Sequence, residues 1–395
     1  MTALLTALLA VPALLLLTLA AFYALEILGA FLPLRTAPAG APGAAAVIVP
    51  AHNESVRLEP ILDDVKRQMR ASDRLLVVAD NCDDDTAEVA MKAGAAVLIR
   101  KDPARRGKGY ALQFALDALK EKPPAVVVFI DADCRLEEGA LARLAGAAAA
   151  SGRPVQGLYL LRAGEDAPAS RKAAEFAWLL MNEARMRGLF TLFDVCRLTG
   201  SGMAIPWTLA ETLDLASGEI VEDLALGLSL TEAGAPPLFC AEARIHSEFP
   251  PTDESAVTQH ARWEHGSLRL AARAAPGLLM RAAARGDIRL AAAALDLAIP
   301  PLSVFGGLIG VMLLAGALAR AAGAPAPLTL SAWAFFLLLG ATAAAWARFG
   351  RAALPASDFG ALAEYLFQKV KVYGTRARAS TKAWTRTGRE EEGGP

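Results

Sequence analysis

Two acidic residues near the first third of the chain stand where both could act on one ligand. Asp131 and Asp133 are separated by one alanine and follow an uncharged, β-branched run at residues 126–130. In a strand, residues two apart point to the same side, and their mutual repulsion falls if a cation lies between them. A hard divalent cation, Mg²⁺ or Mn²⁺, that carries substrate phosphates meets that need. A solvated turn is the alternative that these residues leave open.

A second acidic pair, Glu222 and Asp223, precedes an apolar run at residues 224–230. Acids at a helix start accept hydrogen bonds from free N–H groups and suit the helix dipole, so the pair could be only a cap. Alternatively, one of the two carboxylates is a general base that takes a proton from a hydroxyl group. The residues alone leave both interpretations open.

Two further segments carry groups that suit phosphate and sugar. Gln259, Arg262 and Trp263 lie at positions i, i+3 and i+4, which share one face of a helix. Arginine binds phosphate oxygens in a bidentate manner, and an indole ring suits the apolar face of a sugar. Lys108 lies in a basic, glycine-containing segment ahead of an expected helix at 109–119, where backbone N–H groups can approach phosphate. An amphipathic surface helix and a solvated loop are the respective alternatives.

The elements that must position these groups alternate between strand and helix. Apolar runs at 46–49, 75–79 and 126–130 predict strands, and the stretches 57–69 and 86–93 predict helices. This alternation predicts an α/β fold with a mostly parallel sheet, in which ligands bind beyond the carboxyl ends of the strands. The polar residues at those ends are Asn53, Glu54, Asp80, Asp131 and Asp133.

Several classes of protein are disfavoured by what the sequence contains. No G-x-G-x-x-G follows the first strand and no G-x-x-x-x-G-K-[ST] is present, which disfavours a dinucleotide-dependent dehydrogenase and a P-loop ATPase. The chain has 40 Lys and Arg against 41 Asp and Glu, a formal charge of −1, which argues against nucleic-acid binding. Its four cysteines are widely spaced, so we expect free thiols rather than disulfides or a zinc site.

Apolar residues make up 54 % of the 395 residues, and their excess lies in three blocks outside the predicted α/β region. Residues 2–25 carry no charge and lack the basic start of a signal peptide, so we expect a retained transmembrane helix. Residues 297–319 and 328–347 are also uncharged and flank a short proline-containing loop, which predicts a transmembrane hairpin.

Basic residues flank this hairpin on both sides. Six arginines against two acids lie in residues 262–289, and seven basic residues without an acid lie in residues 369–389. The positive-inside rule then places both flanks in the cytoplasm of a bacterial-type cell and the hairpin tip outside. The expected domains are a transmembrane helix in 1–35, a cytoplasmic domain in 36–289, the hairpin in 290–350 and a basic cytoplasmic tail in 351–395.

The order of the motifs resembles that of one family, the membrane-bound family 2 glycosyltransferases. These are the inverting enzymes related to cellulose, hyaluronan, chitin and poly-N-acetylglucosamine synthases and to ceramide glucosyltransferase. The resemblance covers residues 46–290, and its specificity comes from the ordered set rather than from any one member. The matching segments are V-I-V-P-A-H-N-E (47–54), V-V-A-D-N-C-D-D-D-T (77–86), R-G-K-G-Y-A-L (106–112), D-A-D (131–133), E-D (222–223) and Q-H-A-R-W (259–263).

The resemblance implies a GT-A fold, a nucleotide-sugar donor and a bound Mg²⁺ or Mn²⁺. Asp131 and Asp133 match the D-x-D that positions the diphosphate through the metal, and Lys108 matches a lysine near the nucleotide. The residues that match those holding the nucleotide base and ribose are Pro50, Asn53, Glu54 and Asp80.

The resemblance also implies roles for the later motifs. Asp223 matches the general base, with Glu222 beside it. Gln259 and Arg262 match residues that clamp the diphosphate, and Trp263 matches the residue that stacks on the acceptor. Two departures leave the acceptor open: the common T-E-D reads Val221-Glu222-Asp223 here, and the second place of the common Q-R/Q-x-R-W is His260.

The expected function is inverting transfer of a sugar from a nucleotide-diphospho-sugar, expected to be a UDP-sugar, at the cytoplasmic membrane face. The partners would be that donor, a lipid-linked or glycan acceptor and the lipid bilayer, with no nucleic acid. A processive polysaccharide synthase is the alternative, although three helices make a thin wall for a polymer channel. A transporter or silent scaffold fits less well, because the acids cluster outside the apolar blocks and only Asp296 lies at the edge of one.

Overall fold

A computed structural model gives the structure of residues 2–41, 43–164, 166–216, 221–249, 253–360 and 362, without the side chains of residues 2, 5 and 253–261. The chain divides into two compact units. The helical unit comprises Met1–Leu34, Ala167–Phe193 and Ser267–Tyr373. The sheet unit comprises Arg35–Asp166, Asp194–Gly266 and the segment from Gly374 onward.

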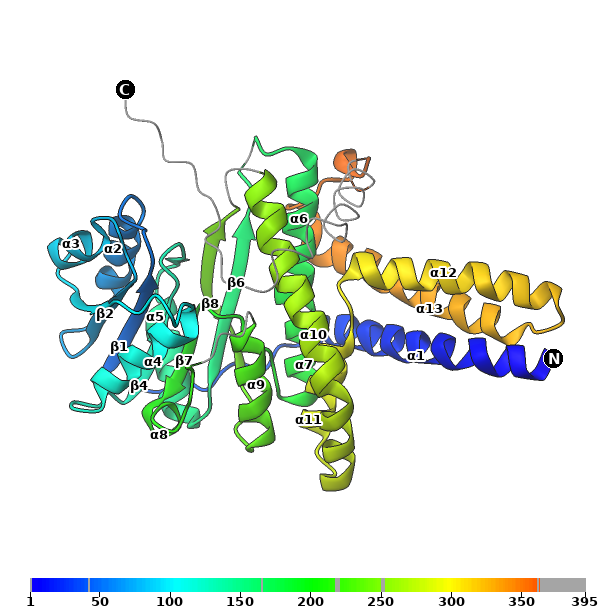
Figure 1. Cartoon of the computed structure of the whole chain (residues 1–395), viewed down its shortest axis with the longest axis horizontal. Coiled ribbons are helices and arrows are strands. Elements are labelled where there is room, and N and C mark those ends of the chain that lie inside the picture. The colour runs from blue at the N-terminus through cyan, green and yellow to red at the C-terminus, as the bar shows by residue number, and fades with distance from the viewer. Residues whose placement is uncertain are drawn as a thin grey trace. The chain divides into compact units, whose positions relative to one another are not determined.

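The sheet unit is built on an eight-stranded mixed sheet with the strand order β3-β2-β1-β4-β7-β6-β8-β5 (Figure 1). Strands β3, β2, β1 and β4 run parallel to one another, and β6 runs parallel to β8, whereas β7 is antiparallel to both β4 and β6. The short β5 pairs antiparallel with β8. The strands are β1 (Ala45–Ala51), β2 (Arg74–Asp80), β3 (Ala96–Arg100), β4 (Val126–Phe129), β5 (Arg135–Leu136), β6 (Val155–Arg162), β7 (Met203–Pro206) and β8 (Leu238–Glu248).

Helices cover both faces of this sheet, which explains why its central strands are apolar along their whole length. On one face, α4 packs its buried Ala111, Leu112 and Leu116 against Ile48 and Phe129. On the other face, α5 contacts β4, β7, β6 and β8. The helices of the sheet unit are α2 (Leu58–Gln68), α3 (Thr86–Lys92), α4 (Lys108–Leu119), α5 (Ala140–Ser151), α8 (Trp207–Ala210), α9 (Glu222–Glu232) and the first half of α10 (Asp253–Arg285).

The predicted strands and helices are present within a few residues, and the main difference lies at Pro50. The sequence predicts that the first strand ends before this proline, but β1 continues to Ala51 and pairs with β2 there. The carbonyl of Ile48 accepts a hydrogen bond from Ile130 N at 3.1 Å, so the backbone groups of Ile48 point toward β4. Residues two apart in a strand have the same orientation, so the backbone of Pro50 points toward the β4 side as well. Strand β4 has ended by then, so the N–H that proline lacks has no strand to bind.

Among the described residues, three helices are long and apolar enough to cross a membrane, and all three belong to the helical unit: Thr6–Gly29, Leu302–Ala321 and Ala326–Gly350. The second begins later than the sequence predicts, because Pro300 and Pro301 separate it from another helix. The helices of this unit are α1 (Thr2–Gly29), α6 (Ala169–Leu179), the π-helix η1 (Leu180–Arg185), α7 (Met186–Phe193), the end of α10, α11 (Ile288–Ala298), α12 (Leu302–Ala321), α13 (Ala326–Ala345), the π-helix η2 (Trp346–Gly350) and the 3₁₀ turn η3 (Ala356–Asp358).

A buried ion triad joins three elements of the helical unit. The guanidinium of Arg185, the last residue of η1, donates to Glu26 Oε2 on α1 and to Asp296 Oδ1 on α11, each at 2.6 Å. Arg185 Nη2 also donates to the Asp296 carbonyl at 3.2 Å. Each of the three residues is at most 5 % exposed. In the same unit α7 and α11 run across the direction of α1, α12 and α13 (Figure 1), and both contact α1. The triad joins α1 to α11 through η1.

Candidate active site

The D-x-D acids lie just beyond the carboxyl end of β4, where the sequence predicts them. One ligand atom from each of Asp131, Asp133 and Cys134 lies within 4.8 Å of the other two. Cys134 is fully buried, its thiol donates to Asp133 Oδ1 at 3.5 Å, and burial and the two carboxylates raise its pKa well above the usual range. The thiol is therefore neutral, and the two half-buried carboxylates are the groups that fit a hard divalent cation.

Lys108 extends from the first turn of α4 into the same space. Its ammonium forms an ion pair with Asp131 and donates to the carbonyl of Gly200 at 2.8 Å. Burial alone would lower the pKa of this lysine, but the carboxylates of Asp131, Glu222 and Asp223 outweigh it and raise the pKa. Lys108 is thus a permanent cation, held where a phosphate would need one.

Glu222 and Asp223 open helix α9 and face this cation. Both are partly exposed, yet protein atoms surround them closely. Burial, together with the Asp223 carboxylate, raises the pKa of Glu222 to about 7 against the opposing pull of Lys108. Burial also raises the pKa of Asp223, and Lys108 and the backbone N–H of Leu224, which donates to Asp223 Oδ1 at 2.9 Å, partly offset it. Both carboxyls are therefore better proton acceptors than exposed acids are.

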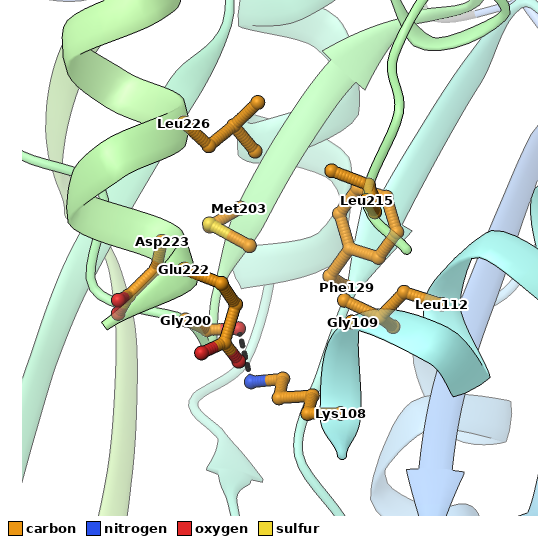
Figure 2. A pocket seen from close by; sticks show the side chains of 10 residues that line it. All are labelled: Lys108, Gly109, Leu112, Phe129, Gly200, Met203, Leu215, Glu222, Asp223 and Leu226. Carbon is orange, nitrogen blue, oxygen red and sulfur yellow. Dashed lines mark hydrogen bonds between the residues drawn. The ribbon is translucent and has the colours of Figure 1, made fainter. Parts of the chain in front are cut away.

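These charged groups stand at one side of a small pocket whose other side is apolar (Figure 2). A glycine lies where they meet: a Cβ on Gly200 would come within 3.1 Å of both Lys108 Nζ and Asp223 Oδ2. Gly200 also has φ +85°, which other residues rarely adopt. Side-chain volume at this position would push the lysine and the acid apart. The remaining described residues that line the pocket are Gly109, Leu112, Phe129, Met203, Leu215 and Leu226.

The segment that contains this glycine, Thr199–Met203, is the part of the site that motif reasoning missed. Its Ser201 hydroxyl accepts a hydrogen bond from Asp131 N at 3.1 Å, and its Gly200 carbonyl accepts from Lys108. The signal in the sequence is T-G-S-G-M, two glycines around one small polar residue directly before β7. Such glycines indicate a close approach of the backbone to other groups.

The ends of β1 and β2 are tied together into one surface. His52 Nδ1 lies 2.7 Å from the carbonyl of Asp80, and Asn53 Oδ1 accepts from Asp83 N at 2.8 Å. Glu54 N donates to the hydroxyl of Thr86 at 2.8 Å. Asn53 has the left-handed φ of 55° that asparagine tolerates better than most residues. Pro50, Asn53, Glu54 and Asp80 are therefore neighbours.

Asp80 is engaged in a buried ion pair, which the sequence did not indicate. Its Oδ1 accepts from Arg100 Nη1 at 2.6 Å and from Asn81 Nδ2 at 3.0 Å. The Arg100 guanidinium also donates to the Arg105 carbonyl at 2.8 Å and lies 5.5 Å from the centre of the Tyr110 ring. Arg100 thus fixes both the carboxylate of Asp80 and the chain that leads into Lys108.

The expected helix around Gln259, Arg262 and Trp263 is present as the first half of α10. Burial lowers the pKa of Arg262, and the Glu222 carboxylate opposes this shift, so the two charges lie within electrostatic reach. Trp263 is half-buried. The side chain of Gln259 lies outside the described residues.

Comparison with known proteins finds some that are similar in sequence and others that are similar in fold. Uncharacterized glycosyltransferases of Mycobacterium bovis and Mycobacterium tuberculosis are 36 % identical over 123 residues, which are 29 % of this chain and 52 % of theirs. The chain thus spans about half the length of these relatives. A mannosyltransferase from Pyrobaculum calidifontis, solved with GDP-Man and Mn²⁺, is 18 % identical with a TM-score of 0.52 and covers 84 % of this chain and 98 % of its own.

That structural likeness confirms the predicted α/β fold of GT-A type. The sequence profile of the family described as "Glycosyltransferase like family 2" matches residues 42–266, more than half of the chain. The matched range spans every residue of the site described above. The chain therefore belongs to glycosyltransferase family 2, as its motifs predict.

Proposed function

We propose that this chain transfers a sugar from a nucleotide-diphospho-sugar to a hydroxyl-bearing acceptor by a single inverting displacement. The proposed donor is a UDP-sugar. The observation that carries the proposal is that the Lys108 ammonium pairs with Asp131 and, with the Asp223 carboxylate, lies beside Gly200. A cation, a metal-binding carboxylate and a proton acceptor are thereby held at one point. A sugar transfer by direct displacement needs these three groups.

The leaving diphosphate is the part of the reaction that needs positive charge. Asp131 and Asp133 would hold Mg²⁺ or Mn²⁺, which when bound stabilises the negative charge of the departing nucleoside diphosphate. The oxygen ligands of the D-x-D fit such a cation, and the neutral thiol of Cys134 lies behind them. Lys108 contributes a second positive charge, and Arg262 with Gln259 would hold the phosphates from α10.

Asp223 is the proposed base, with Glu222 as the neighbour that shares its charge. Asp223 would take the proton of the acceptor hydroxyl as that oxygen attacks the anomeric carbon, and Trp263 would lie against the acceptor. The raised pKa values of both acids support this role, because a raised pKa makes a carboxylate a stronger proton acceptor. Pro50, Asn53, Glu54 and Asp80 would hold the nucleotide base and ribose.

The acceptor is proposed to be lipid-linked or a glycan at the cytoplasmic face of the membrane. Support comes from the three helices long and apolar enough to span a bilayer. The GDP-Man and Mn²⁺ bound to the Pyrobaculum mannosyltransferase support a nucleotide-sugar donor and a divalent cation here. Transfer of one sugar or a short chain is preferred to processive synthesis.

The test uses membranes that contain the full chain and a panel of radiolabelled UDP- and GDP-sugars with Mn²⁺ or Mg²⁺. Label from one donor should enter a lipid or glycan fraction as one or a few units, and excess chelator should stop it. Asp133→Ala should lose donor binding and turnover together. Full turnover in chelator would overturn the metal assignment, and long polymer would favour the processive alternative.

A further inference from the structure

We propose that Gln156, a residue outside every motif of the family resemblance, is the positioning residue that sets Lys108 and Asp131 for the donor diphosphate. This proposal rests on the proposed function, because the diphosphate is the ligand those two residues would serve. Gln156 lies on β6 and is fully buried. It touches neither residue directly and acts through the segment Thr199–Gly202.

Both ends of the Gln156 amide form hydrogen bonds to this segment, and the nitrogen also binds the next residue of β6. The amide nitrogen Nε2 donates to the carbonyl of Ser201 at 2.8 Å and to that of Gly157 at 2.9 Å. The amide oxygen Oε1 accepts from Thr199 N at 2.9 Å. These contacts use both a donor and an acceptor, so neither an ionised carboxylate nor an apolar side chain can replace them. A buried polar group with all its bonds made also fixes the geometry of its partners.

The segment that Gln156 holds is in turn the partner of the two charged residues. Lys108 donates to the Gly200 carbonyl, and Asp131 N donates to the Ser201 hydroxyl. Gly202 N also donates to the carbonyl of Phe129, the last residue of β4, at 2.9 Å. The position of the segment therefore sets where the lysine and the D-x-D lie.

The segment depends on an outside anchor because of its own composition. Gly200 and Gly202 have φ of +85° and +69°, and glycine has the greatest backbone freedom of all residues. Within the described residues, the Thr199 hydroxyl oxygen is buried and has no hydrogen-bond partner, so that side chain contributes no anchor. Backbone hydrogen bonds hold the Gly202 end of the segment, from Gly202 N to Phe129 and, at 2.8 Å, from Gly157 N to the Gly202 carbonyl. The Gln156 side chain is what restrains Thr199 and Ser201.

Gln156→Glu gives a test with a signature that general destabilisation would not produce. An ionised carboxylate at this position would present oxygen to the Ser201 and Gly157 carbonyls and repel them. When protonated, the same group regains one O–H donor. Burial favours that neutral form, so the effect of the substitution should shrink as the pH falls.

The experiment uses the full chain in detergent and compares wild type, Gln156→Glu and the control Thr231→Val. Thr231 is also buried, and its hydroxyl donates only within α9, to the Gly227 carbonyl at 2.7 Å. The two readouts are hydrogen exchange of peptides that cover residues 199–202 and calorimetric binding of UDP or GDP with Mn²⁺. In Gln156→Glu, exchange should rise and nucleotide affinity should fall by about tenfold at pH 8, the usual scale for one buried hydrogen bond.

The comparison with wild type at each pH separates the possible results. The affinity deficit of Gln156→Glu should narrow at about pH 5.5, and Thr231→Val should show no deficit at either pH. Unchanged exchange, or faster exchange with unchanged nucleotide affinity, would overturn the proposal. If wild type bound no nucleotide, the proposed function would fail, and exchange alone would then decide whether Gln156 holds the segment.

Discussion

At the scale of single residues, the two acids at the start of α9 differ in what their oxygens contact. Asp223 Oδ1 binds the backbone N–H of Leu224, whereas its Oδ2 lies beside the space above Gly200. One oxygen thus fixes the carboxylate and leaves the other to face a substrate. Burial and the Asp223 carboxylate raise the pKa of Glu222 to about 7, and the charge of Glu222 in turn acts to raise the pKa of both Lys108 and Arg262.

The first prediction is that Asp223→Asn abolishes most sugar transfer but leaves donor binding intact. The amide keeps the shape of the side chain and accepts no proton, so sugar transfer should fall by at least about 10²-fold, the usual contribution of a positioned base. Donor affinity, measured by calorimetry, should stay near wild type. Asp117→Asn, an exposed acid on α4, is the control. Near-normal transfer would shift the base to Glu222, and lost donor binding would make Asp223 structural.

The second prediction concerns the pH dependence of stability. The folded chain raises the pKa of Glu222 from 4.5 to about 7, so folding favours its protonated form. That contribution is complete below about pH 4.5 and is lost as the pH rises through about 7. Glu222→Gln removes the titration, so its melting temperature should exceed that of wild type increasingly between about pH 5 and pH 8. A gap that stays constant with pH would contradict the assignment.

Local spacing could indicate only candidate residues that form a pattern with their neighbours in sequence. D-A-D, E-D and the i, i+3, i+4 pattern all rest on residues close along the chain. Spacing could not predict the contact of Lys108 with Gly200 or of Asp80 with Arg100, because each joins residues on different elements. Gln156 was the hardest of these residues to predict, because nothing beside it in the sequence indicates a role for its amide.

At the scale of elements, the triad of Glu26, Arg185 and Asp296 joins α1, η1 and α11 within the helical unit. Two carboxylates share one guanidinium away from water, so each partner depends on the others. Removing one member of such a buried set costs far more than removing an exposed pair, because the remaining charges stay buried. The triad should therefore fix how these three helices pack.

The third prediction is that Arg185→Met destabilises the chain by about 3–5 kcal/mol, the usual cost of leaving buried charges without a partner. Arg187→Met is the matched control. Arg187 pairs with Glu183 at 3.0 Å one helical turn away, and its side chain is 21 % exposed against 6 % for Arg185. Thermal unfolding in detergent should show a much larger loss for Arg185→Met. Equal losses would mean that the triad adds nothing beyond a partly buried helical pair.

Periodicity and breakers predicted most elements, and their failures have physical causes. The sequence predicts that the first strand ends at Pro50, but a strand tolerates proline where it has no neighbour on that side. The π-helix η1 carries no sequence signal, although it supplies Arg185. The antiparallel half of the sheet was also beyond prediction, because the pairing of β7 with β4 and β6 depends on contacts far apart in sequence.

At the scale of the whole molecule, the fourth prediction concerns membrane topology. The arginines of residues 262–289 and the basic residues of 369–389 favour a cytoplasmic location for both flanks. A reporter inserted at Gly323, between α12 and α13, should therefore behave as external, and one fused after Arg389 as cytoplasmic. The two reporters serve as controls for each other. The reverse pattern would put the nucleotide-sugar site on the side without cytoplasmic donors.

The proline of β1 also bears on how this chain avoids wrong association. Beyond Ile48, strand β1 is paired on one side only, and such an unpaired edge can accept a strand from another chain. Pro50 lies half-buried in this stretch, between the buried Val49 and Ala51, and it has no N–H to offer to another strand. This end of β1, which carries one of the residues proposed to hold the nucleotide, therefore lacks a backbone donor that pairing with another chain would use.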